Sequence, residues 1–77
     1  MLTIHPEILK QLKEYYTAGT RVMLIRMSDP YTNLRNGDRG TVTMVDDIGM
    51  IHVKWDRGST LDVVFGEDEC RRIEGNE

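Results

Sequence analysis

A chain of 77 residues, 39% apolar and 30% charged, has room for one globular domain with a modest core, and this composition excludes a largely disordered protein. Its net charge of −3 argues against non-specific binding to nucleic-acid phosphates. The single cysteine, Cys70, excludes an internal disulfide, and no segment approaches the roughly 20 apolar residues that cross a bilayer, so we expect a soluble, cytoplasmic protein.

Residues 5–17 predict an amphipathic helix at the start of the domain. Pro6 suits the first helical position because its missing N–H costs nothing there. Apolar side chains then recur at helical spacing, and Gly19 is a plausible stop just beyond the helix. The resulting apolar stripe consists of Ile8, Leu9, Leu12, Tyr15 and Tyr16.

Residues 20–27 predict a first strand that is apolar on both faces. Val22 and Leu24 share one face, and Met23, Ile25 and Met27 share the other. A strand of this kind is covered on both sides. We therefore expect the face of Val22 to form the core and the helix to dock on the opposite face, which leaves the protein a monomer.

The rest of the chain predicts a polar loop at 28–39, strands at 40–45, 50–55 and 60–65, a short last strand near 70–73 and a mobile tail at 74–77. Gly49 and Gly58 stand where tight turns need a left-handed residue. Both turns bring apolar residues onto one face, and a slip of one residue would undo both. The expected pairs are Val45–Met50, Met44–Ile51, Val42–Val53, Val53–Leu61 and Ile51–Val63.

The residues also carry a resemblance, in the runs R-V-M-L-I-R-M-S-D-P-Y, G-D-R-G-T-V-T-M-V-D-D-I-G and I-H-V-K-W-D-R-G-S-T-L. They resemble a family of small bacterial proteins, the domain-of-unknown-function family of the 4314 series, over residues 19–73. This implies a cytosolic protein of bacteria or their mobile elements, and it brings no activity, cofactor or catalytic residue. Similar G-T-V and W-D-x-G pieces occur in other SH3-like barrels, which implies a binding role.

The fold class that we predict is mainly β. Residues 1–77 form a single domain, in which a small SH3-like barrel of about five antiparallel strands at 20–73 follows the N-terminal amphipathic helix.

The chain offers only weak candidates for catalytic or metal-binding residues. Asp46, Asp47 and Asp56 are better explained as turn residues, because aspartate bonds nearby backbone N–H groups. His5, His52 and Cys70 lack the paired spacing of a zinc site. Trp55 shares strand parity with Ile51 and Val53, which favours the core over a ligand-stacking role with Tyr31 or Phe65. We expect no enzyme, no cofactor and no metal.

The outward face of the sheet is the more interesting surface, since the expected register aligns Thr43, His52 and Asp62 in one row and Thr41, Lys54 and Thr60 in the next. We expect a non-catalytic module that engages an unknown protein partner through the loop at 28–39 and the adjoining strands. The alternative is a nucleic-acid-binding barrel, which steep salt dependence of binding would distinguish. The candidate binding surface is Tyr31, Arg35, Arg39, Thr41, Thr43, His52, Lys54, Arg57 and Asp62.

Overall fold

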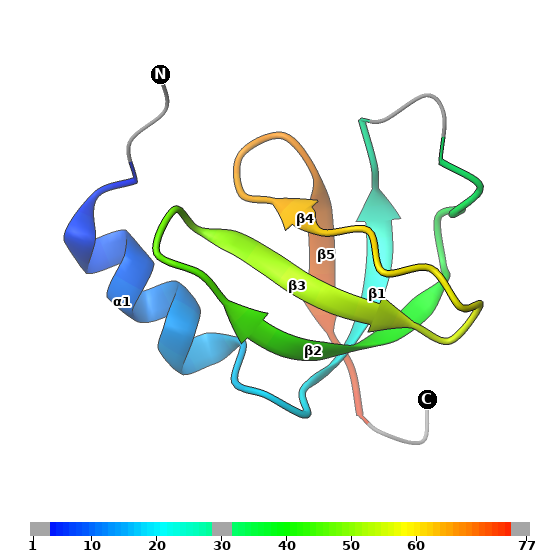
Figure 1. Cartoon of the computed structure of the whole chain (residues 1–77), viewed down its shortest axis with the longest axis horizontal. Coiled ribbons are helices and arrows are strands. Elements are labelled where there is room, and N and C mark those ends of the chain that lie inside the picture. The colour runs from blue at the N-terminus through cyan, green and yellow to red at the C-terminus, as the bar shows by residue number, and fades with distance from the viewer. Residues whose placement is uncertain (1–3, 29–31, 75–77) are drawn as a thin grey trace.

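The computed structural model describes residues 4–28 and 32–74. It contains one helix followed by five antiparallel strands in a single sheet of order β4-β3-β2-β1-β5 (Figure 1). The mainly β fold class is therefore confirmed. The elements are α1 (Pro6–Tyr15), β1 (Arg21–Arg26), β2 (Arg39–Val45), β3 (Met50–Trp55), β4 (Val63–Val64) and β5 (Glu69–Arg72). Residues 75–77 of the expected mobile tail lie outside the described residues.

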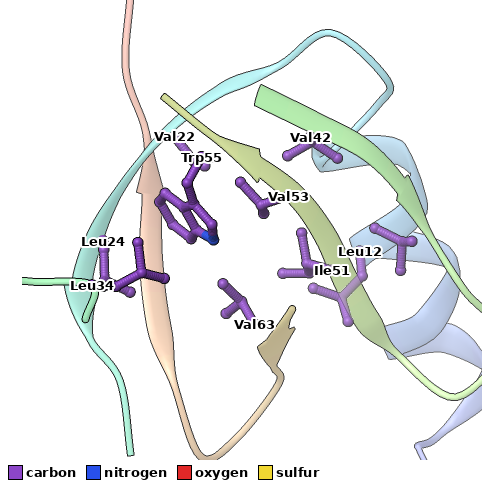
Figure 2. Close-up of a cluster of buried hydrophobic side chains, with 10 residues drawn as sticks. Leu12, Val22, Leu24, Leu34, Val42, Ile51, Val53, Trp55 and Val63 are labelled. Atoms are coloured by element: carbon purple, nitrogen blue, oxygen red, sulfur yellow. The ribbon is translucent and has the colours of Figure 1, made fainter. Parts of the chain in front are cut away.

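The core is built around the indole of Trp55, which is 1% exposed. Figure 2 shows its ring surrounded by apolar side chains from the other strands, among them Val22, Leu24 and Val63. The indole N–H donates to the backbone carbonyl of Leu61 at 2.8 Å, so its one polar atom is satisfied inside the core. The structural role predicted for Trp55 is confirmed.

The helix closes one end of this core. The imidazole of His5 caps its first turn by accepting from the backbone N–H of Glu7 at 3.1 Å. Leu12 is buried in the core, and Leu9 and Tyr16 pack against it. The stripe thus docks as predicted, but the expected surface was wrong. Within the described residues α1 contacts β2 and not β1, because Leu12 completes the inner layer of the barrel.

The outer face of β1 has other neighbours than the helix. Met23 stands opposite Arg39 of β2 and Arg71 of β5, which places these three residues side by side on one face of the sheet. A bulge at Ile25 then reverses the side-chain alternation, because Leu24 pairs with Cys70 and Arg26 with Glu69. Met27 consequently packs against the core, and its predicted place on the outer face is wrong.

A second bulge, at Thr43 in β2, changes the predicted register. Val42 pairs with Val53 as expected, but the extra residue places Met44 opposite His52 and Val45 opposite Ile51. The predicted pairs Met44–Ile51 and Val45–Met50 are therefore wrong by one position. The bulge lets both Val42 and Val45 point into the core and leaves Met44 exposed.

The fourth strand is shorter than the prediction of 60–65. Its pairing of Val63 with Ile51 is confirmed, whereas Val53 and Leu61 do not form a strand pair. The Leu61 carbonyl accepts from the Trp55 indole instead. Residues 60–62 therefore run beside the buried Trp55 ring, and the chain joins the sheet only from Val63 onward, in β4.

Asp68 ties the two edges of the sheet together beside β4. Its carboxylate accepts from the backbone N–H of Ser28 at 2.8 Å, from the Ser28 hydroxyl at 2.7 Å and from the backbone N–H of Val64 at 2.9 Å. Burial pulls the pKa of Asp68 upward, but these hydrogen bonds outweigh it and leave the pKa below its usual value. The end of β1, the end of β4 and the start of β5 thus meet at one buried carboxylate.

Gly40 should be sensitive to any side chain, because the ring of Trp55 occupies the space beside it. A Cβ at Gly40 would lie 2.6 Å from Val53 Cγ1 and 2.9 Å from Trp55 Cε3. We expect Gly40→Ala to lower the free energy of unfolding by about 1–3 kcal/mol, measured by urea denaturation. In a Val53→Ala background, Gly40→Ala should lower the free energy of unfolding by a smaller amount. An unchanged unfolding midpoint for Gly40→Ala would contradict this packing.

Candidate functional site

An apolar groove runs between α1 and the end of β4, and we call it the α1–β4 groove. It consists of two adjoining hollows of about 430 Å³ each, which share Ile8 and Phe65. Its volume is in the range of sites that take drug-sized ligands or a few side chains. The lining includes Ile4, Ile8 and Tyr15 on the helix side, Ile48 on the β2–β3 turn, and Val64, Phe65 and Glu67 on the β4–β5 side.

Exposed apolar side chains are concentrated in this groove. The described part of the chain exposes five large apolar side chains, and four of them line it: Ile48 (70% exposed), Tyr15 (50%), Phe65 (46%) and Ile8 (40%). Met44 is the fifth and lies elsewhere. Scattered apolar residues are normal on a protein surface, whereas a concave cluster of them marks a binding site.

The β2–β3 turn that presents Ile48 is held firmly. Asp46 accepts from the backbone N–H groups of Ile48 at 3.2 Å and Met50 at 2.9 Å, as predicted for a turn aspartate. Gly49 has a φ of +87°, and Ile4 Cδ1 lies 2.8 Å from the place where a Cβ would stand. Ile4 therefore packs directly on the turn, and this contact joins the helix side of the groove to the Ile48 side.

A polar cluster occupies the outward face of β3. The His52 ring lies between two carboxylates, with Nε2 at 2.9 Å from Asp46 and Nδ1 at 3.2 Å from Asp62. The hydrogen bond to Asp46 and the charge of Asp62 raise the pKa of His52 above its ordinary value. The predicted outward pairing of His52 with Asp62 is confirmed, and the involvement of Asp46 was not anticipated.

Four of the predicted surface residues gather around a shallow hollow of about 190 Å³ beside this cluster: Thr43, His52, Lys54 and Asp62. The bulged Thr43 is also held there, since its hydroxyl donates to the His52 carbonyl at 3.2 Å. Thr41 pairs with Lys54 as expected. The carboxylates flank opposite ring nitrogens, and among residues 4–28 and 32–74 no three His, Cys, Asp or Glu side chains could hold a metal ion.

The predicted arginines do not form one patch with these residues. Arg57 donates from Nε to Asp38 at 3.0 Å, and hydrogen bonds from the Arg35 backbone and from Arg57 lower the pKa of Asp38. Arg35 and Arg39 are exposed. Tyr31 lies outside the described residues. Arg21, which was not predicted, forms two hydrogen bonds to Asp56 at 2.7 and 2.6 Å.

The remaining candidate residues, Cys70 and Trp55, pack in or against the core. Burial raises the pKa of Cys70 to about 11, so its thiol is protonated at neutral pH. Cys70 packs against the core from β5, while His52 faces outward on β3, and the two do not form a nucleophile pair. Trp55 is buried and Phe65 is exposed, so these rings do not form an aromatic cage.

Reasoning from the sequence missed the α1–β4 groove, although one signal was available. Ile48 is a large apolar residue at the tip of an Asp-Asp-Ile-Gly turn, where it cannot reach the core. Ile8 and Tyr15 were assigned to the docking face of the helix. Only the observed orientation of α1, with Leu12 inward, leaves these two side chains exposed beside Phe65.

Comparison with known proteins identifies the family. Residues 5–73 match the family described as Domain of unknown function (DUF4314). The chain belongs to this family. Curated proteins give no match, and neither do solved structures. The family assignment confirms the resemblance seen in the sequence and carries no activity. Among the described residues, no helix is long and apolar enough to span a membrane.

The stability of the domain should depend on the protonation of His52. A pKa raised by folding adds stability that is complete below the ordinary value of about 6.5 and is lost as the pH rises through the folded pKa. We therefore expect the free energy of unfolding to fall as the pH rises above about 6.5, the ordinary pKa of histidine, and before the pH reaches the ordinary cysteine pKa of 9.0.

The control for this prediction is His52→Gln, which keeps polar contacts but cannot titrate in that range. The free energy of unfolding, measured by urea denaturation at several pH values, should depend less on pH in His52→Gln than in the wild-type protein. An equal dependence of the unfolding free energy on pH in both proteins would contradict this contribution of His52 to stability.

Proposed function

We propose that this protein is a non-catalytic protein-interaction module that binds an apolar segment of a partner protein in the α1–β4 groove. The observation that supports this most is the collection of four exposed large apolar side chains around one concave surface. Their burial on binding would contribute roughly 25 cal/mol for each Å² of apolar surface removed from water.

The groove is also preorganised for binding. Lys13 of α1 forms an ion pair with Asp47 of the β2–β3 turn at 2.6 Å, and Ile4 packs on Gly49. On the other side, Asp68 holds the start of β5 against β4. A site whose walls are already fixed loses little conformational entropy when a ligand enters.

The proposed surface differs from the one that the sequence suggested. The loop at 32–38 is anchored to the domain, since Leu34 is buried and Asp38 binds both the Arg35 backbone and the Arg57 side chain. The side chains of Thr32 and Asp38 thus already have partners inside the protein. The α1–β4 groove instead exposes four large apolar side chains, although the Arg72 guanidinium lies over the ring of one of them, Tyr15. This exposed apolar area favours the groove over the loop.

Nucleic-acid binding stays the second-ranked proposal. The register brings Arg39, Arg71 and Lys54 onto the outer sheet face, but Met23 separates the two arginines and no exposed aromatic ring accompanies them on those strands. Base stacking on aromatic side chains supplies much of single-strand affinity. A cytoplasmic location and a link to a bacterial mobile element likewise stay predictions.

The groove hypothesis is tested with peptides selected on the unchanged protein from a random 12-residue library. Ile48→Ser and Phe65→Ser should each weaken binding of the selected peptides about tenfold, corresponding to about 1.4 kcal/mol of lost apolar contact. Both residues are exposed, so unfolding free energies should stay within about 1 kcal/mol of the unchanged protein.

Met44→Ser is the matched control, because it removes an exposed apolar side chain outside the groove. It should leave peptide affinity unchanged. If Ile48→Ser and Phe65→Ser bind the peptides as well as Met44→Ser does, the groove is not the binding site and the proposal fails.

A further inference from the structure

The apolar α1–β4 groove has acidic residues along both sides. On α1, Glu7, Gln11 and Glu14 follow the i, i+4, i+7 spacing that places side chains on one ridge, and Gln11 lines the groove. On the opposite side, Glu67 lines the groove directly. All three glutamates are exposed.

Lysine and arginine are missing from the described lining of the groove, although the Arg72 guanidinium on β5 lies 4.6 Å from the centre of the Tyr15 ring. Lys13 lies towards the β2–β3 turn, where its ammonium is held by Asp47 at 2.6 Å. Lys10 is turned away from Ile8 and Tyr15, since it is two and five positions from them. It is a helical neighbour of Glu7 and Glu14, but it forms no ion pair with either. The side chains of Glu7, Glu14 and Glu67 form no hydrogen bond or ion pair within the described residues.

We propose that the groove selects a partner segment whose apolar side chains are flanked by lysine or arginine. This inference rests on the proposed protein-binding function and adds the chemistry of the partner. The apolar centre of such a segment would fill the hollows beside Ile8 and Phe65, and its basic flanks would reach Glu7 and Glu14 on one side and Glu67 on the other. An acidic segment of equal apolarity would meet like charge on both sides.

The inference is tested with synthetic peptides in which only the flanks vary. The apolar centre of the most enriched library peptide is made with lysine, serine or glutamate on both sides, and affinities are measured by titration calorimetry. At low salt the lysine version should bind about three- to tenfold more tightly than the serine version, as expected for two or three exposed ion pairs. The glutamate version should bind most weakly, and added salt should narrow these differences.

Variants of the protein test which glutamates cause the preference for the lysine peptide. Glu7→Gln with Glu67→Gln should reduce the advantage of the lysine peptide and leave the serine peptide unaffected. Glu69→Gln is the matched control, because it removes an exposed acid on β5 that does not line the groove. It should change neither affinity.

The possible outcomes separate this inference from the proposed function. Equal affinities for the three peptides, all weakened by Ile48→Ser, would overturn the charge preference and leave the groove as the binding site. Peptide binding that is insensitive to Ile48→Ser would overturn both. A change of oligomeric state in Ile48→Ser or Phe65→Ser, measured by analytical ultracentrifugation, would identify the occupant as a second copy and would also overturn the inference.

Discussion

The buried carboxylate of Asp68 is the contact on which the closure of the described sheet and the position of the groove depend. A five-stranded sheet leaves two edges, and here they are β4 and β5. Asp68 satisfies the backbone N–H groups of Ser28 and Val64 at the same time, so it joins the end of β1 to the end of β4. The backbone N–H of Asp68 also donates to the Val64 carbonyl at 2.9 Å. Removing the carboxylate would leave polar groups unpaired, which is costly where water is excluded.

This closure also explains the position of the groove. The β4–β5 turn, with Phe65 and Glu67, is held on one side by Asp68, and α1 is held on the other by Leu12 in the core. The helix stripe is wider than the core requires. Leu12 is buried, while Ile8 and Tyr15 are left on the surface facing the turn. The groove thus arises from two elements that the core anchors separately.

Much of this fold can be predicted from local chemistry. Three predicted features each have a physical cause within a few residues: Pro6 at the start of the helix, the left-handed Gly49 and Gly58 in the turns, and the parity of Trp55 with Val53. The bulges at Ile25 and Thr43 could not be predicted this way. A bulge forms where both Val42 and Val45 gain burial, and that gain depends on the shape of the assembled core.

The candidate site was harder to predict for the same reason. The outward pairing of His52 with Asp62 follows from strand alternation and could be predicted. The groove depends on three segments distant in sequence, and its composition resembles that of a core. Ile8 and Phe65 are apolar in either role, so only the tertiary arrangement shows that they stay exposed. Asp68 similarly reads as a turn residue until its partners Ser28 and Val64 are known.

The most direct test of this account is amide hydrogen exchange, measured residue by residue by NMR in the unchanged protein and in Asp68→Ala. Loss of the carboxylate should speed exchange at the amides of Ser28 and Val64, while the amides that pair β2 with β3 keep their protection. That result would show that Asp68 holds the β4–β5 turn in place on a sheet that is otherwise stable. Unchanged exchange at Val64, or an equal loss of protection across all strands, would contradict it.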